Sequence, residues 1–191
     1  MPPAHPIFKA IANQQISINS NTNLFLELTR DEIVTIGVTG TKGKSTTSSV
    51  IYHLLKNAGL RVALGGNIGL PPLDLLRKPV SGEAVAETAA TAETAATSTK
   101  TTAASSTEIT PNFDYCVLEL SDHQLLDVKH SPNIAVILDI SPEHLDYYEN
   151  FQSYVAAKAN IAKFQNKNDY IIYNPSFKYP TEIARSSKAT K

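Results

Sequence analysis

Short apolar runs alternate with amphipathic stretches along most of the chain. Residues 33–38 form a β-branched run, a glycine-rich loop follows it, and apolar side chains then recur at helical spacing up to Gly59. This pattern predicts a strand, a loop and a helix. Further runs predict strands at 62–64, 115–120, 134–140 and 170–173, a short helix from Pro71-Pro72 to near Arg77, and a longer helix at 151–164.

Continuous apolar strands between helices are typical of a parallel sheet that is buried on both faces. We therefore expect an α/β domain: a mostly parallel sheet with helices on both faces. Residues 1–30 open with three prolines and carry a short alternating segment at 16–18 that could form one strand, so we interpret them as a lead-in rather than a domain. Residues 81–110 are mostly Ala, Ser and Thr with no aromatic side chain, which predicts a low-complexity surface insertion.

A glycine-rich loop carries the strongest chemical signal. Residues 37–46 read GVTGTKGKST between the first strand and the first helix. Glycines allow backbone N–H groups to converge on phosphate oxygens, and the N-terminus of the helix adds positive charge. Lys44 supplies a point charge for the phosphates and Ser45 a hydroxyl for Mg²⁺. We predict a P-loop that binds ATP through Gly40, Thr41, Lys42, Gly43, Lys44, Ser45 and Thr46, although Val38 stands where the general pattern has glycine.

Two polar residues follow predicted strands. Glu119 lies at the end of one strand and His144 lies after another, so both are expected at the carboxyl edge of the sheet, where open α/β sheets bind ligands. A carboxylate there could hold Mg²⁺. Lys158 lies on the predicted helix at 151–164, where a solvated lysine is the ordinary interpretation.

Several segments, in order, resemble the Mur ligase family. TGTKGKST at 39–46 is similar to the family's TGTxGK(S/T) signature, which folylpolyglutamate synthases share. The resemblance favours the branch that adds D-glutamate to UDP-N-acetylmuramoylalanine, through GGNIGLP at 65–71, LELS at 118–121, ISPEHLD at 140–146 and YVAAK at 154–158. It implies a central ATP-binding domain at 31–178, with a tail at 179–191 and with residues 1–30 as the end of an N-terminal UDP-binding domain.

The resemblance also implies a set of metal ligands. Ser45 and Glu119 would share one Mg²⁺ with the ATP phosphates. His144 would bind a second Mg²⁺ together with a carbamylated Lys158, since the carbamate turns a repelling cation into an oxygen ligand. Lys44, His144 and Lys158 would be the catalytic residues.

Asn67 and Ser121 would contact the substrate, although an Asn in a glycine-rich loop also suits a simple turn. This sequence departs from the family pattern at several positions near these residues. Asn is usual at Asp139, Asp is frequent at Glu143, and a Ser-Phe pair is usual at Asp122-His123. These departures leave the predicted ATP site intact and concern how the substrate is bound.

Composition excludes several classes of protein. Seventeen Lys and Arg against 18 Asp and Glu leave a net charge of -1, so no basic field favours nucleic acid. The single cysteine, Cys116, lies in an apolar run, which excludes a disulfide framework and indicates a reducing compartment. The sequence shows no signal-peptide pattern and no apolar stretch near the ~20 residues that span a bilayer. We expect a cytoplasmic protein with no membrane partner.

The implied reaction transfers the γ-phosphoryl group of ATP to the carboxylate of UDP-N-acetylmuramoylalanine, and D-glutamate then attacks the acyl phosphate. A full family member also has a C-terminal domain that binds the amino acid, which we expect to be absent here. The chain would then be an incomplete ligase that acts when a longer native chain or a partner chain supplies the missing parts. The alternatives are a folylpolyglutamate synthase-like fragment, a stand-alone ATP-binding module, and a small kinase, for which the 81–110 insertion is a poor lid.

Overall fold

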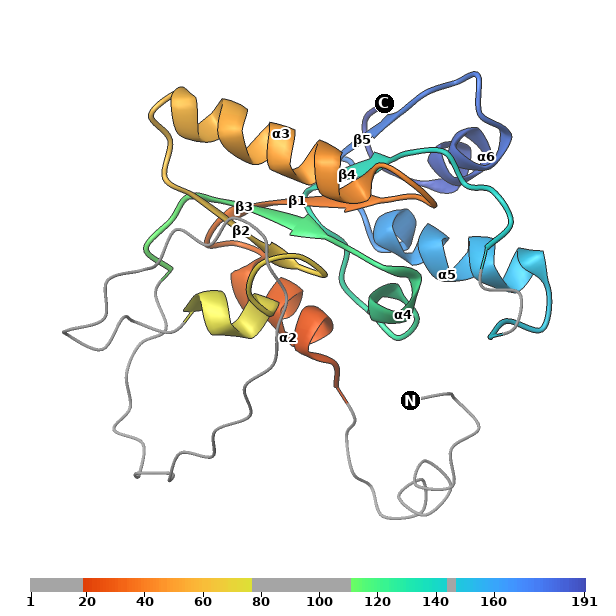
Figure 1. Ribbon diagram of the computed structural model, residues 1–191, viewed down its shortest axis with the longest axis horizontal. Helices are drawn as coiled ribbons and strands as arrows, with labels where there is room; N and C mark the ends of the chain where they lie inside the picture. Colours follow the sequence, from red (N-terminus) through yellow and green to blue (C-terminus); the bar gives the residue numbers. More distant parts are fainter. Residues whose placement is uncertain (1–18, 77–110, 144–146) are drawn as a thin grey trace, which may run out of the picture.

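The computed structural model of the chain describes residues 19–76, 111–143 and 147–191 (Figure 1). The predicted strand at 16–18, the insertion at 81–110 and His144 lie outside the described residues. Within the described residues, no helix is long and apolar enough to cross a membrane.

A five-stranded parallel sheet forms the centre of the fold. Its strands are β1 (Val34–Thr39), β2 (Val62–Gly66), β3 (Tyr115–Glu119), β4 (Ile134–Ile137) and β5 (Tyr170–Tyr173), in the order β2-β3-β1-β4-β5. Every pairing is parallel. The predicted fold class is therefore confirmed, and each of the five strands lies where the apolar runs placed it. The predicted strand at 134–140 ends at Ile137 in the structure. Leu138 N–H still donates to Thr39 O at 2.9 Å, but Asp139 O beyond it accepts from Thr41 N–H of the glycine loop.

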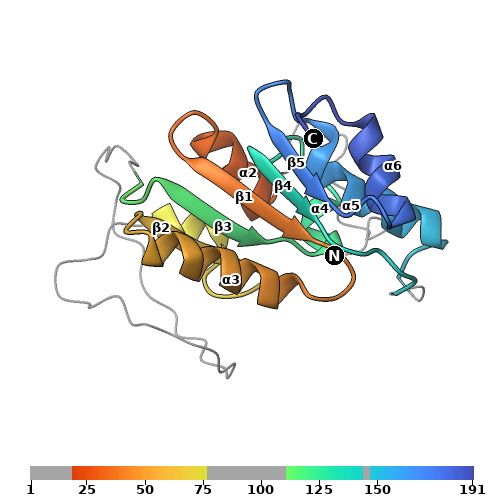
Figure 2. The same ribbon diagram turned by 90° about the horizontal axis from the view of Figure 1, so that it is seen from above.

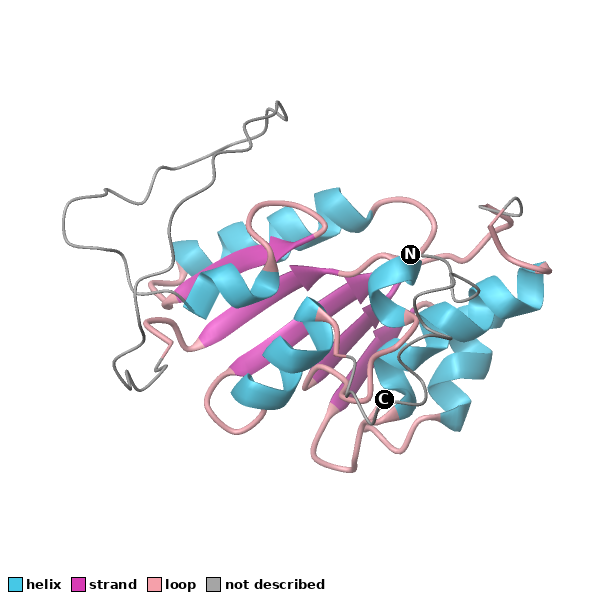
Figure 3. Ribbon diagram, turned by 90° about the horizontal axis from the view of Figure 1, so that it is seen from below, coloured by secondary structure: helices cyan, strands magenta, loops and turns pink. Residues whose placement is uncertain are grey.

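Helices cover both faces of this sheet. Helix α3 (Lys44–Asn57) packs on β1, β2 and β3 from one side. The opposite side is covered by α2 (Asn21–Thr29), the 3₁₀ helix η1 (Pro72–Leu76), α4 (Asp122–Leu125) and α5 (Phe151–Lys163), while α6 (Lys178–Ser186) packs on α5 and β5. Figure 3 shows this second layer in front of the sheet, with α3 behind it.

The two faces of the sheet form separate apolar cores. The smaller core lies under α3 and includes Ile36, Val38, Val117 and Val136. The larger one, under the other helices, contains Phe25, Leu118, Leu125 and Ile161, all of which are fully buried. The alternation follows from the pleat, because neighbouring residues of a strand point to opposite faces. Sandwiching the strands in this way holds their carboxyl ends in fixed positions.

Three of the observed helices were not predicted from the sequence. Helix α2 is capped by Ser20, whose hydroxyl accepts a hydrogen bond from Asn23 N–H, and the helix buries Phe25 and Leu26. Helix α6 lies in the segment interpreted as a tail, and it buries Ile183. The third, α4, is a single short turn after β3.

Candidate functional site

The carboxyl ends of β1, β3 and β4 meet at one edge of the sheet (Figure 2). Val38 of β1 lies in register between Glu119 of β3 and Val136 of β4. Just beyond the strands, Leu120 N–H donates to Val38 O at 2.9 Å, which continues the ladder past the end of β3. The loops that follow these three strands are therefore neighbours, and their polar residues share one site.

The glycine loop joins β1 to α3 at this edge. Gly40 has a φ of +151°, and a Cβ built there would lie 2.6 Å from Leu138 Cβ, so a side chain would collide with the β4 loop. Gly43 has a φ of +82° and caps α3, with no side-chain hydrogen bond at the cap. A Cβ built there would lie in ordinary contact with Leu138 Cδ1, at 3.5 Å. Glycine is thus required at Gly40 by close approach and at Gly43 by backbone conformation.

The loop presents its binding groups outward. Lys42, Gly43, Ser45 and Thr46 are exposed around the first turn of α3. The N–H groups of a first helical turn have no partners within the helix, and they carry partial positive charge. Lys44 curls over the loop and donates from Nζ to Gly40 O at 3.1 Å and Thr41 O at 2.8 Å. An anion at this helix end would meet backbone donors and a lysine together.

Thr41 differs from its neighbours in the loop because its side chain points inward. The residue is 6% exposed. Its hydroxyl donates to Ser141 O at 3.0 Å and accepts from Ser141 N–H at 2.9 Å, and it lies 3.2 Å from the Tyr154 hydroxyl. Its N–H donates to Asp139 O at 2.8 Å. The Thr41 side chain therefore ties the glycine loop to the β4 loop and to α5.

Glu119 lies at the predicted sheet edge beside the glycine loop, and Asn67 contacts it there. Asn67 donates from Nδ2 to Glu119 Oε1 at 3.1 Å, and its N–H donates to Glu119 O at 2.8 Å. Gly66 permits this approach, since a Cβ there would overlap the Glu119 backbone. Glu119 is 2% exposed, yet its Oε2 has no hydrogen-bond partner in the described structure.

Lys158 is fully buried, contrary to the ordinary interpretation of a helix lysine. Its Nζ lies 4.6 Å from the centroid of the Tyr154 ring and 3.6 Å from Asp122 Oδ1, and it has no hydrogen-bond partner in the described structure. Burial lowers the pKa of Lys158 to about 8, against the attraction of Asp122, and the charge of Lys44 lowers it further. The fraction of neutral amine at pH 7 is consequently on the order of a hundredfold larger than for a free lysine.

Asp122 is held in place from several sides. Tyr148 donates its hydroxyl to Asp122 Oδ2 at 2.8 Å, and His123 Nδ1 lies 3.2 Å from the same oxygen. Burial raises the pKa of Asp122, but the Tyr148 hydrogen bond and the Lys158 charge outweigh it, so the pKa lies below its usual value. Burial and the Asp122 carboxylate together raise the pKa of Tyr148. Asp122 is therefore the carboxylate and Tyr148 the neutral donor.

Ser121 has a structural part in this arrangement. It is the N-cap of α4, where it forms a capping box with Gln124: Gln124 N–H donates to the Ser121 hydroxyl, and Ser121 N–H donates to Gln124 Oε1 at 3.0 Å. Cys116 lies away from this chemistry, buried in β3, and burial raises the pKa of its thiol.

The residues present fit a cation at this edge only in part. Within the described part of the chain, no three His, Cys, Asp or Glu side chains lie close enough together to form a metal site. The buried Glu119 Oε2 is nevertheless an oxygen that needs a partner, and a hard cation is a suitable one. The buried Lys158 amine likewise has no hydrogen-bond partner in the described structure.

Several residues that the sequence predicted for the site lie near this edge, but sequence reasoning missed their neighbours. Lys44, Ser45, Asn67, Glu119 and Lys158 all come from elements that converge here, while His144 lies outside the described residues. The contacts of Lys158 with Asp122 and Tyr154 were missed, and so was Tyr148, which donates to Asp122. The only sequence signal for Asp122 was its departure from the family pattern.

A glycine loop between a buried parallel strand and a helix, beside an acidic strand end, defines an α/β domain of the P-loop nucleotide-binding class. Residues 38–191 match the model of the Mur ligase middle domain, so the chain belongs to that family. Among curated proteins it is similar to the UDP-N-acetylmuramoylalanine--D-glutamate ligase of Acetivibrio thermocellus, with 33% identity over 183 residues, which are 96% of this chain and 32% of the relative. The chain thus spans about a third of the length of this relative.

Two solved structures share the fold. The UDP-N-acetylmuramate:L-alanyl-gamma-D-glutamyl-meso-diaminopimelate ligase from Neisseria meningitides matches with a TM-score of 0.57 and 16% identity, over 100% of this chain and 55% of that one. E. coli FolC in complex with ADP matches with a TM-score of 0.51 and 15% identity, over 100% and 52%. At these identities the likeness concerns the fold, which confirms the predicted central-domain architecture.

Proposed function

We propose that this chain is the ATP-binding core of a peptidoglycan-precursor ligase that joins D-glutamate to UDP-N-acetylmuramoylalanine. In this reaction the substrate carboxylate receives the γ-phosphoryl group of ATP, and the amino group of D-glutamate displaces phosphate from the acyl phosphate. The observation that carries the proposal is the open N-terminus of α3, with Lys44 over the glycine loop, at the sheet edge where Glu119 is buried without a partner for Oε2. The name of the A. thermocellus relative supports the choice of substrates.

The glycine loop would hold the phosphates. Its N–H groups at the start of α3 and the Lys44 ammonium lie where they can neutralise phosphate charge, and Thr41 fixes the loop in that shape. Positioning and charge neutralisation are most of what phosphoryl transfer needs from a protein. The ADP named for the E. coli FolC structure is in keeping with this role.

Two Mg²⁺ sites are part of the proposal. Glu119 would hold one ion together with the Ser45 hydroxyl. The Oε2 atom of Glu119 has no hydrogen-bond partner in the described structure, and it lies at the sheet edge where α3 begins. Lys158 would help to hold the other as a carbamate, with His144 as a further ligand. Bound Mg²⁺ would offset charge on the transferring phosphoryl group. Asn67 would keep Glu119 oriented through its hydrogen bond to Oε1 and would border the substrate.

The partners and location follow from the same proposal. The ligase would act in the cytoplasm on a UDP-sugar-peptide and an amino acid, and the amino-acid domain would be supplied by a longer chain or a partner chain. A folylpolyglutamate synthase-like fragment is the second candidate, since FolC shares the fold. A stand-alone ATP-binding module is the third.

Calorimetric titration of Mg-ATP tests the proposal. The wild-type chain should bind, and Lys44→Ala should weaken binding about 100-fold or more with little change in thermal stability, because it removes a charged phosphate contact and no core. Lys56→Ala, at the other end of α3, is the matched control and should bind like the wild type. Equal affinities in Lys44→Ala and the wild type would contradict the assignment of the loop.

A further inference from the structure

Asp122 is a second buried carboxylate at this edge, at a position where the family pattern usually has serine. Its side chain is 6% exposed, and its Oδ1 lies 3.6 Å from the Nζ of the fully buried Lys158. Neither the family resemblance nor the proposed ligand set gives this residue a role. Its direct contact with the lysine makes it relevant to any modification of that amine.

The direction of the Asp122 carboxylate is fixed. Oδ2 accepts the Tyr148 hydroxyl hydrogen bond at 2.8 Å and lies 3.2 Å from His123 Nδ1, while the capping box of Ser121 holds the turn of α4. With Oδ2 engaged in this way, Oδ1 is the oxygen turned toward Lys158. Asp122 therefore cannot leave the lysine without breaking these contacts.

Carbamylation would reverse the charge opposite Asp122. The lone pair of the neutral Lys158 amine forms a bond to the carbon of CO₂, one C=O π pair moves onto oxygen, and a proton leaves Nζ for water. The product carries one negative charge where the ammonium carried one positive charge. Two carboxylate-like anions would then lie a few ångströms apart in a buried site, where like charges repel strongly.

A cation between the two anions removes this repulsion. Oxygen atoms of Asp122 and of the carbamate are both suitable ligands for a hard divalent ion. We propose that Asp122 makes carbamylation of Lys158 depend on a bound divalent cation, because its carboxylate would repel the carbamate unless a cation offset the charge of both. This inference rests on the carbamate of the proposed function. Because linkage is reciprocal, the carbamate would tighten cation binding by the same factor.

Nuclear magnetic resonance with ¹³C-labelled bicarbonate tests the inference on the full chain. The carbamate signal is measured with and without Mg²⁺ in the wild type, in Asp122→Asn, and in Lys158→Met, which identifies the signal by its loss. In the wild type, Mg²⁺ should raise carbamate occupancy at least about tenfold. Asp122→Asn keeps the shape without the charge, so it should carry the carbamate without Mg²⁺ and respond no more than about twofold.

Three outcomes would overturn the inference. The first is equal occupancy in the wild type with and without Mg²⁺, and the second is the same Mg²⁺ dependence in Asp122→Asn. The third is no carbamate signal in either protein, which would also remove the carbamate from the proposed function while leaving Mg-ATP binding to be judged by calorimetry. If Asp122→Asn fails to fold, Asp122→Ser, the residue usual in the family, takes its place with the same expected result.

Discussion

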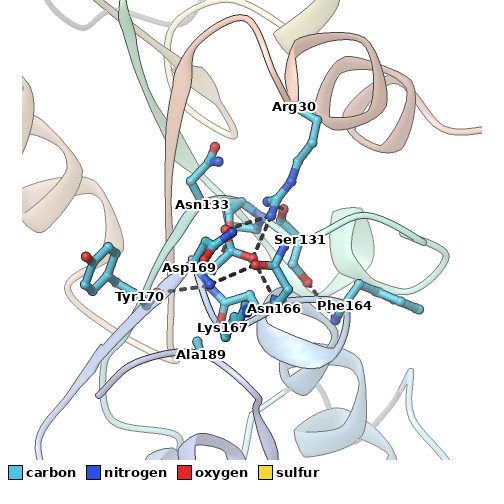
Figure 4. A network of polar contacts seen from close by, with 12 residues as sticks. Arg30, Ser131, Asn133, Phe164, Asn166, Lys167, Asp169, Tyr170 and Ala189 are labelled. Atoms are coloured by element: carbon cyan, nitrogen blue, oxygen red, sulfur yellow. Dashed lines mark hydrogen bonds and ion pairs between the residues drawn. The ribbon is translucent and has the colours of Figure 1, made fainter.

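The two edges of the sheet differ in whether their buried charged groups have hydrogen-bond partners. At the amino edge, Arg30 donates to both carboxylate oxygens of Asp169 at 2.7 and 2.6 Å and to Ser131 O at 3.1 Å (Figure 4). Asn166 N–H also donates to Asp169, at 2.8 Å. At the carboxyl edge, Glu119 Oε2 and Lys158 Nζ are buried without hydrogen-bond partners in the described structure.

This difference separates stability from function. A buried polar group that is satisfied by the protein contributes to the fold, whereas an unsatisfied one costs free energy unless a ligand completes it. The Arg30 network joins the segments that precede β1, β4 and β5, so it fixes where these strands begin. The unsatisfied groups lie at the other edge, where Glu119 ends β3 and Lys158 lies on α5. We infer that the amino edge is built for stability and the carboxyl edge for binding.

The largest effect on stability is expected at the amino edge. Arg30→Met should lower the free energy of unfolding by about 3 kcal/mol, because it leaves Asp169, whose side chain is 2% exposed, without its counter-charge. Urea denaturation measures this. The matched control is Arg61→Met, which removes the ion pair between Arg61 and Asp114. These two side chains are 64% and 51% exposed, so the stability of this variant should equal that of the wild type. Similar losses in both variants would break the comparison between the edges.

A smaller and opposite effect is expected at the carboxyl edge. Burial lowers the pKa of Lys158 to about 8, so between pH 8 and the usual lysine value near 10.5 the unfolded chain binds more protons than the folded one. The stability of the wild type relative to Lys158→Met should therefore rise across this window, by roughly 1–3 kcal/mol. Below pH 8 the burial penalty is fully present, and Lys158→Met should be at least as stable as the wild type.

Urea denaturation at pH 7 and pH 10 in CO₂-free buffer measures this difference. Taking the difference between the two proteins cancels groups common to both, such as Tyr148. If the difference in free energy of unfolding between the two proteins did not change with pH, burial would not disfavour the charged form of Lys158. The contrast between the two edges would then rest on Glu119 alone.

The sequence predicted the sheet well because each strand is a continuous apolar run and each helix behind it is amphipathic. It also predicted the glycine loop and the place of Glu119 at the carboxyl edge, since the carboxyl ends of parallel strands share an edge. The hydrogen bond from Asn67 to Glu119 was not predicted. Helix α6 was missed because Pro180 lies inside it, which looks like a break but is tolerated in the first turn. Helix α2 was missed because its large apolar residues, Leu24 to Leu28, span little more than one turn, which is too short for a helical repeat to be recognised.

Other parts of the site depend on contacts between distant segments. Tyr148 reaches Asp122 across 26 positions, and Thr41 reaches Tyr154 across 113. No local pattern encodes such contacts. The burial of Lys158 also depends on a distant segment. A single lysine on an amphipathic helix is expected to be exposed to solvent unless the acidic residue opposite it is known.

The central claim is that the unsatisfied groups of the carboxyl edge await a nucleotide and its cation, and Glu119→Gln tests it most directly. This variant keeps the acceptor for Asn67, so its stability should lie within about 1 kcal/mol of the wild type. The measurement is calorimetric titration of ATP with Mg²⁺ and with a chelator in its place. The wild type should lose at least about tenfold in affinity without Mg²⁺, and Glu119→Gln should bind weakly in both conditions. An undiminished Mg²⁺ dependence in Glu119→Gln would contradict the claim.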